Sequence, residues 1–216
     1  MKIKNNFNQN NFLLSDLIKS KVYLGLIKSM KDPAIFSYLL GIRHNFCIFD
    51  LNKTIKILKK ILKIILKINQ SKKTIFFIGF PESQKKIFKM LLKNKKHLYS
   101  FEESWVNGIL TNGKDLFLYK SNFLKNLELK KEKEKFFFYQ KFGGLLNLTK
   151  KPDLIVIFNH SKSLDAFNEA FKVQIPVISF VNSGNNPSKV DYPIPGNFTS
   201  NKGVKLYYNL IKHSLN

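Results

Sequence analysis

Cysteine, arginine and alanine are almost missing from this chain of 216 residues. The single cysteine, Cys47, excludes an intramolecular disulfide and a cysteine cluster for zinc, and its apolar neighbours predict a small core residue. No apolar run is long enough to cross a bilayer as a helix. The opening MKIKNNFNQNNF has neither the apolar core of a secretory signal nor the arginines of a transit peptide. We therefore expect neither disulfides nor a membrane anchor.

Catalytic patterns are also scarce. The four histidines are scattered without the spacing of metal ligands. His160 follows an apolar run, where open α/β sheets place ligands, but no Gly-x-Ser-x-Gly motif accompanies it. Asp50 lacks the further acids of a metal or phosphorylation site, and the turn after Gly79 has one glycine and Glu82 where phosphate would bind. We therefore expect no catalytic residues, no metal and no cofactor.

Lysine dominates what is present. The chain has 37 Lys and Arg against 14 Asp and Glu, which gives a formal net charge of +23. Such a charge opposes compaction, so an anionic partner is expected, with nucleic acid first and an anionic membrane surface second. Lys, Asn, Phe and Ile share A/T-rich codons, so part of the excess reflects base composition. Lysine neutralises phosphate without the guanidinium fork that reads base edges, which predicts RNA binding through shape and backbone.

The last third of the chain predicts a strand–helix–strand unit. Apolar runs at 154–158 and 176–181 have the length of buried strands, and Leu164, Phe167 and Phe171 recur between them at helical spacing. Such a unit indicates a parallel sheet with helices against it. Further apolar runs predict strands at 46–51, 74–79 and 97–101.

Two helices are predicted before the run at 74–79. Apolar residues from Leu13 to Leu26 recur at helical spacing, which predicts a helix over 13–27. Asn52 is positioned to cap the second helix. That helix carries a stripe of Lys53, Lys56, Lys60, Lys63 and Lys67 opposite an apolar face. A cationic amphipathic helix also suits a membrane surface, but a helix tied between strands should lay its apolar face on the sheet and turn its lysines to solvent or protein.

Several motifs follow one another in the order and spacing of a known family. They are Gly41-Ile42-Arg43 before Ile48–Leu51, Ile75–Gly79, the loop with Trp105, Gly108, Leu110, Thr111 and Asn112, then Gly143-Gly144, and Val190–Asn197 with its two prolines. In these motifs the chain from about residue 12 onward resembles the small-subunit ribosomal protein number two family of bacteria and organelles. The resemblance implies an α/β fold, a flavodoxin-like three-layer parallel sheet of about five strands with an inserted, shortened helical hairpin.

The resemblance also implies a function and a domain organisation. The function is that of a structural constituent of the small ribosomal subunit of an organelle, which binds rRNA and neighbouring ribosomal proteins during translation. It implies no enzymatic activity, no small-molecule substrate and no membrane partner. Residues 1–11 are expected to be disordered, 12–216 to form a single α/β domain, and 114–150 to form the hairpin within it.

RNA-facing residues are expected near the N-terminus, before the strand at 46–51, and around the tryptophan loop. They are Lys28, Lys31, Arg43, His44, Asn107, Thr111, Asn112 and Lys114. Arg43, Thr111 and Asn112 match the family pattern, and packing or turn roles are the alternative for all eight. Trp105 is expected to be a structural anchor that packs its loop on the sheet, with base stacking as the alternative.

The codon bias and the missing import signal together favour a mitochondrially encoded protein of the mitoribosome in the matrix. A plastid and the cytoplasm of an A/T-rich bacterium are the alternatives. A second class of function stays open, a flavodoxin-like nucleotide-binding protein or enzyme from an A/T-rich genome. That class needs a glycine-rich or acidic site in the turns at the strand ends, which the sequence does not show.

Overall fold

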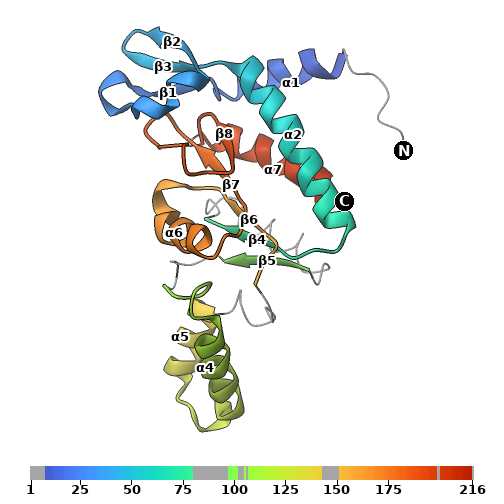
Figure 1. The fold of residues 1–216 in the computed structure, drawn as a ribbon, viewed down its shortest axis with the longest axis vertical. Coiled ribbons are helices and arrows are strands. Elements are labelled where there is room, and N and C mark those ends of the chain that lie inside the picture. Colours follow the sequence, from blue (N-terminus) through green and yellow to red (C-terminus); the bar gives the residue numbers. More distant parts are fainter. Residues whose placement is uncertain are drawn as a thin grey trace. The chain divides into compact units, whose positions relative to one another are not determined.

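The chain forms two compact units, one of residues 1–71 with 178–216 (unit 1) and one of residues 72–177 (unit 2). A computed structural model describes residues 8–79, 97–101, 105, 107–142, 151–198 and 200–215 (Figure 1). Residues 1–7 and 143–150, which belong to the predicted disordered segment and the predicted hairpin, lie outside the described residues.

A five-stranded sheet has the order β5-β4-β6-β7-β8. Its strands are β4 (Ile75–Ile78), β5 (Leu98–Phe101), β6 (Leu154–Ile157), β7 (Val177–Val181) and β8 (Tyr192–Pro195). β4 pairs in parallel with β5 and β6, and β7 pairs in parallel with β8. Counted along the chain within this sheet, the order is 2-1-3-4-5, which is that of flavodoxin-like folds. The predicted α/β class and the flavodoxin-like sheet are confirmed.

The predicted strand at 46–51 belongs to a different sheet. β3 (Phe46–Phe49) pairs antiparallel with β1 (Leu24–Ile27) and β2 (Leu39–Arg43). His44 and Asn45, which join β2 to β3, both have positive φ, 46° and 66°, as a tight two-residue hairpin turn requires. The expectation that this run is a strand of the parallel sheet is wrong, and β8 takes its place. The two prolines of β8 suit an outermost strand because proline cannot donate to a further neighbour.

The helix predicted over 13–27 ends early. α1 covers Asn8–Lys19, and Lys21 follows with a φ of 55°, which right-handed helix does not allow. Beyond it the backbone pairs in β1 rather than continuing the helix. The helical spacing of Val22 and Leu26 therefore misled the prediction, because sheet pairing decides the conformation of this segment.

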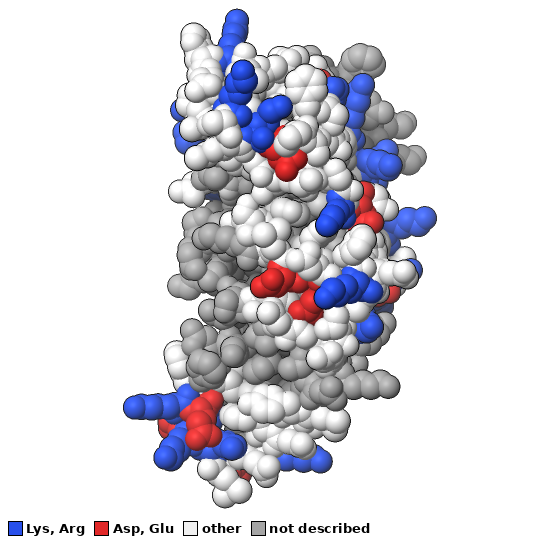
Figure 2. Space-filling model, turned by 60° about the vertical axis from the view of Figure 1, so that its left-hand side comes forward, with Lys and Arg blue, Asp and Glu red and all other residues white. Residues whose placement is uncertain are grey.

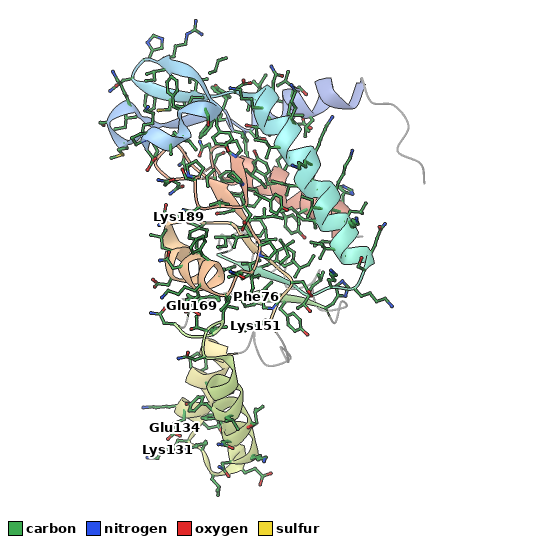
Figure 3. The ribbon with its side chains drawn as sticks, viewed as in Figure 1. Phe76, Lys131, Glu134, Lys151, Glu169 and Lys189 are labelled. Atoms are coloured by element: carbon green, nitrogen blue, oxygen red, sulfur yellow. The ribbon has the colours of Figure 1, made fainter. Side chains whose placement is uncertain are left out.

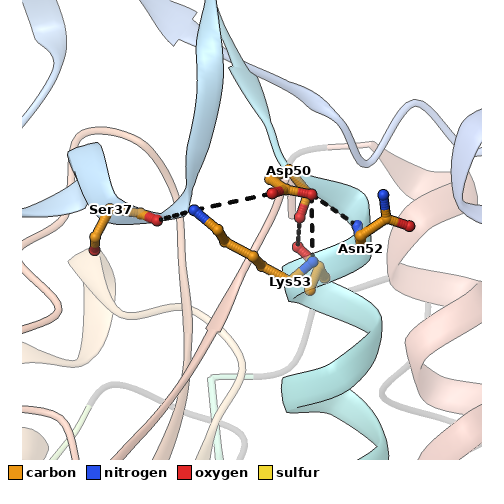
Figure 4. Close-up of polar contacts among 5 residues, drawn as sticks. Ser37, Asp50, Asn52 and Lys53 are labelled. Carbon is orange, nitrogen blue, oxygen red and sulfur yellow. Dashed lines mark hydrogen bonds and ion pairs between the residues drawn. The ribbon is translucent and has the colours of Figure 1, made fainter.

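Helix α2 (Leu51–Gln70) is capped by Asp50 and not by Asn52. Oδ1 of Asp50 accepts hydrogen bonds from the backbone N–H of Asn52 at 3.0 Å and of Lys53 at 3.3 Å (Figure 4). Nζ of Lys53 lies 3.9 Å from Oδ2 of Asp50 and donates to the carbonyl of Ser37 at 2.8 Å. Asp50 therefore stabilises the start of the helix.

The core of unit 1 lies beneath α2. This helix packs against α7 (Asn201–Leu215) and β8 (Figure 1). Leu58, Ile61 and Ile65 of α2 are at most 1% exposed. Burial of side chains of this kind is worth about 2 kcal/mol each, so the apolar face of α2 fixes the helix on its unit.

Unit 2 holds the rest of the sheet and the hairpin. All residues of β4 and β6 are buried, and α6 (Leu164–Lys172) follows β6 after the short helix η5 (Ser161–Ser163). The hairpin comprises α4 (Gly113–Lys125), the short helix η3 (Leu127–Leu129) and α5 (Glu132–Phe142). The rings of Phe123 and Phe138 stack between its two helices at 3.9 Å.

Candidate nucleic-acid interface

One group of expected RNA-facing residues lies at one end of the antiparallel sheet in unit 1. The short helix η1 (Lys28–Met30) follows β1, and Arg43 is the last residue of β2. The N–H of Lys28 donates to the carbonyl of Asn45 at 2.8 Å, which places Lys28 beside the turn after Arg43. Lys28, Arg43 and His44 are all exposed. The structure thus brings these three side chains to the same end of the sheet, where they can meet a partner.

Lys31 follows η1 and is half-buried. Its Nζ lies 5.1 Å from the centroid of Phe36, a cation–π contact with a ring that is 67% exposed. The next residue, Asp32, caps the short helix η2 (Pro33–Tyr38) by accepting from the N–H of Ala34 at 2.8 Å. Lys31 therefore presents its charge together with an exposed aromatic face.

The loop of unit 1 that contains Ser183 forms hydrogen bonds with the backbone of this sheet and of the segment after it. The N–H of Leu26 donates to Oγ of Ser183 at 2.7 Å, and the N–H of Asp32 donates to the carbonyl of Ser183 at 2.9 Å. A Cβ on Gly25 would lie 2.8 Å from Oγ of Ser183 and 3.1 Å from Cβ of Cys47, so only glycine allows this approach. The basic end of the sheet is positioned by these backbone contacts.

The second group lies in the tryptophan loop of unit 2, which a buried carboxylate holds. Oε1 of Glu169 accepts from Nε1 of Trp105 at 3.0 Å and from the N–H of Gly108 at 2.6 Å. Oε2 accepts from the N–H of Leu110 at 3.0 Å. The Trp105 ring lies 6.1 Å from that of Phe76 in β4, and Figure 3 shows Glu169 and Phe76 in this part of the unit. The loop is thus tied to both α6 and the sheet.

Because Glu169 binds the backbone of the loop, the polar side chains of the loop remain exposed to solvent. Asn107, Thr111 and Asn112 are exposed, and the N–H of Asn112 donates to the carbonyl of Gly108 at 2.7 Å. Lys114 lies in the first turn of α4, and its side chain is outside the described residues. The structure therefore brings Asn107, Thr111 and Asn112 together on one loop of unit 2. They form a second group of expected RNA-facing residues, distinct from the group in unit 1.

Sequence reasoning missed Glu169. The available signal was a carboxylate on the otherwise apolar face of α6, between Phe167 and Ala170, which are both buried. A buried carboxylate needs several donors, and here they come from a loop about 60 residues earlier in the chain. Nothing in the local sequence of α6 identifies that loop.

Part of the basic charge on the hairpin is compensated by ion pairs. Lys135 lies 2.7 Å from Glu132, and Lys130 lies 3.6 Å from Glu134. Figure 2 shows acidic and basic side chains intermixed at the lower end of the view, whereas basic ones predominate at the upper end. The hairpin is therefore a poorer match for a polyanion than the lysine-bearing surfaces of unit 1.

The features of an enzyme site are weak in the described parts of the chain. His160 follows β6 as expected, but it is buried, its ring lies 5.2 Å from Phe167, and burial lowers its pKa. Among the described residues, no three His, Cys, Asp or Glu are grouped to hold a metal. Within the same residues, no helix has both the length and the apolar character needed to span a membrane.

The chain thus combines a flavodoxin-like α/β fold with exposed basic and polar loops, an arrangement suited to an anionic partner. The family model described as Ribosomal protein S2 matches residues 17–216, so the chain belongs to that family. The small ribosomal subunit protein uS2 of Sinorhizobium medicae (strain WSM419) is 28% identical over 214 residues, covering 93% of this chain and 84% of that protein. The protein of the same name from Endomicrobium trichonymphae is 30% identical over 219 residues, covering 93% and 88%. That from Rickettsia massiliae (strain Mtu5) is 28% identical over 215 residues, covering 91% and 72%.

Membership of the family confirms the class of protein that the motifs predicted. It is a structural ribosomal protein of the small subunit and not an enzyme. Proteins of this family bind rRNA and other small-subunit proteins.

Proposed function

We propose that this chain is a structural constituent of the small ribosomal subunit of an organelle, most specifically the mitochondrion. In that subunit it binds rRNA and neighbouring ribosomal proteins during translation. The family match over residues 17–216 carries the ribosomal part of the proposal. The relatives named above are bacterial, so the organellar part is supported only by the abundance of Lys, Asn, Phe and Ile, residue types that share A/T-rich codons.

The proposed RNA-facing residues are the two groups described above. They are Lys28, Lys31, Arg43, His44, Asn107, Thr111, Asn112 and Lys114. The support is exposure in the described parts of the chain, which is shared by Lys28, Arg43, His44, Asn107, Thr111 and Asn112. Cations and amide or hydroxyl groups of this kind contact phosphate and sugar, which fixes a protein on folded RNA without reading its sequence.

Sedimentation tests the function. Lysates of isolated mitochondria, of plastids where present, and of the cytosol are run on sucrose gradients and probed for this chain. We expect co-migration with the small subunit in the mitochondrial gradient. Recovery only in the low-mass fractions, at a salt concentration that keeps subunits intact, would contradict a ribosomal role. Co-migration with cytosolic or plastid subunits would contradict only the mitochondrial assignment.

Salt dependence tests the RNA-facing residues. Each phosphate that lysine neutralises contributes roughly 0.7 to 0.9 to the slope of log affinity against log salt. Lys114→Ala is expected to lower that slope by about one and to weaken binding to all RNA sequences alike. Lys133→Ala, an exposed lysine in α5 between two glutamates, is the matched control and should leave the slope unchanged. Equal slopes for the two variants would remove Lys114 from the interface.

A further inference from the structure

Four lysines of α2 form an exposed row with no acidic residue among them. Lys56, Lys60, Lys63 and Lys67 recur at spacings of four, three and four residues and are all exposed. At 3.6 residues per turn these spacings keep them on one side of the helix, in a row about 16 Å long at 1.5 Å per residue. We call these four residues the α2 lysine row.

The row lacks compensation within the described parts of the chain. Asp50 pairs with Lys53 at the start of the helix, one turn before the row. Neither α2 nor α7, which packs against it, contains Asp or Glu, and α7 adds the exposed Lys202 and Lys205. Helix α1 also packs against α2 and contains Asp16, which forms no ion pair with the four lysines among the described residues. No ion pair joins a described residue to any of the four lysines. This differs from the hairpin, where Lys130 and Lys135 have glutamate partners.

Such a row is unfavourable in the free chain. Like charges three and four residues apart on a helix repel each other, and the row contains three such pairs. The repulsion is relieved when a polyanion lies along the row, and condensed counterions leave the polyanion at the same time. The uncompensated charge therefore favours a partner with regularly repeated negative groups.

Two polyanionic partners could lie along the row, an anionic membrane and RNA, and the burial of α2 favours RNA. An amphipathic helix that lies on a membrane inserts its apolar face, but the apolar face of α2 is already buried, with Leu58, Ile61 and Ile65 at most 1% exposed. Only the exposed, lysine-bearing face of α2 is therefore available to contact a partner. Lysine suits phosphate as a point charge, and the row offers no arginine or aromatic side chain for reading bases.

We propose that the α2 lysine row binds the phosphate backbone of RNA, as a contact additional to the two groups named under the proposed function. The proposal rests on that function, which makes rRNA the RNA in question. It replaces the expectation that this stripe meets solvent or protein. Binding through the row is independent of RNA sequence because only phosphates are contacted.

The test compares two full-length variants of equal charge. The row variant is K56Q/K60Q/K63Q/K67Q, and glutamine keeps the helix propensity of lysine. The control is K131Q/K133Q/K172Q/K189Q, which removes four other exposed lysines. Binding to a small-subunit rRNA transcript is measured between 50 and 200 mM salt. Flotation with vesicles of phosphatidylglycerol and phosphatidylcholine is measured in parallel, and circular dichroism checks that each variant is folded.

We expect the row variant to lower the salt slope by about 3 and the control variant by less than about 1. RNA affinity falls as salt rises from 50 to 200 mM. With a slope lower by 3, this fall is roughly 60-fold smaller in the row variant than in the unchanged chain. Equal slopes for the row variant and the unchanged chain would overturn the proposal, even if the variant no longer entered subunits, because the row would then contact protein. A row variant that loses vesicle binding and keeps its RNA slope would overturn it in favour of a membrane. Absence of the unchanged chain from subunits is a separate result, which would reject the proposed function.

Discussion

The indole Nε1 of Trp105 donates a 3.0 Å hydrogen bond to Oε1 of Glu169, a carboxylate that is only 8% exposed. The backbone N–H groups of Gly108 and Leu110 donate to the same carboxylate. One side chain of α6 thus satisfies three donors of a loop that contains no regular secondary structure at these positions. The shape of the loop therefore depends on the charge and the acceptor capacity of Glu169.

Glu169→Gln should destabilise unit 2 while preserving side-chain volume. The glutamine amide turns one acceptor into a donor, so at least one of the three loop donors loses its partner. The expected decrease in the free energy of unfolding is about 2 kcal/mol. Tryptophan fluorescence during denaturant unfolding measures it, since Trp105 is the only tryptophan. Glu128→Gln, at an exposed position, is the control and should change stability by less than about 0.5 kcal/mol. Equal effects of the two variants would show that the carboxylate does not hold the loop.

Phe138→Ala should loosen the hairpin. Phe138 is 2% exposed and stacks on Phe123 at 3.9 Å, so its removal leaves a cavity between α4 and α5. The expected cost is about 3 kcal/mol, measured as faster amide hydrogen exchange in α4 and α5. Phe136 is 71% exposed on the same helix, and Phe136→Ala should leave exchange nearly unchanged. Similar exchange in both variants would mean that the stack does not stabilise the hairpin.

Tyr207→Phe should make stability less sensitive to alkaline pH. Tyr207 is 1% exposed, its hydroxyl has no hydrogen-bond partner among the described residues, and burial raises its pKa above the ordinary 10.0. The unfolded chain loses this proton near pH 10 while the folded chain keeps it. The contribution to stability is therefore complete below pH 10 and falls as the pH rises further.

Denaturant unfolding at pH 8 and pH 11 measures the effect. At pH 8 Tyr207→Phe should be neutral or stabilising by about 1 kcal/mol, because it removes a buried hydroxyl without a partner. Between the two pH values it should lose less stability than the unchanged chain. Tyr119→Phe, at a position 52% exposed, is the control and should follow the unchanged chain. A parallel loss in all three proteins would exclude Tyr207 as the titrating group.

The row variant K56Q/K60Q/K63Q/K67Q should be more stable than the unchanged chain when no RNA is present. Three like-charge pairs are removed, and each costs about 0.2 to 0.5 kcal/mol, so the expected gain is about 1 kcal/mol. The gain should shrink in 1 M salt, where charges are screened within about 3 Å. Thermal unfolding at low and high salt measures both. A loss of stability at low salt would show that the lysines are compensated in the folded chain.

The buried parallel strands were predictable because each is a short, continuous apolar run. β4, β6 and β7 coincide with the runs at 74–79, 154–158 and 176–181, and all their residues are buried. Cys47 is also buried, as its apolar neighbours predicted. Burial on both sides of a strand leaves a strong signal in the local sequence.

The elements that sequence reasoning missed depend on distant residues. The hairpin turn at His44 and Asn45 contains no glycine to mark it, and β1 exists because β3 lies beside it. The N-cap was misplaced by two residues, from Asp50 to Asn52, since both residue types cap helices equally well. The role of Glu169 requires the loop at Gly108, which no local pattern connects with it.

Unit 1 is assembled from the two ends of the chain, residues 1–71 and 178–216. Hydrogen bonds join the two segments, from Leu26 to Ser183, from Thr54 to Pro195, and from Asn69 to Leu215. During synthesis the first part leaves the translating ribosome long before its complement has been made, whereas unit 2 is continuous and can fold as it emerges. A nascent chain that stops before β7 therefore exposes the apolar face of α2 to chaperones and proteases, so only completed copies bury it.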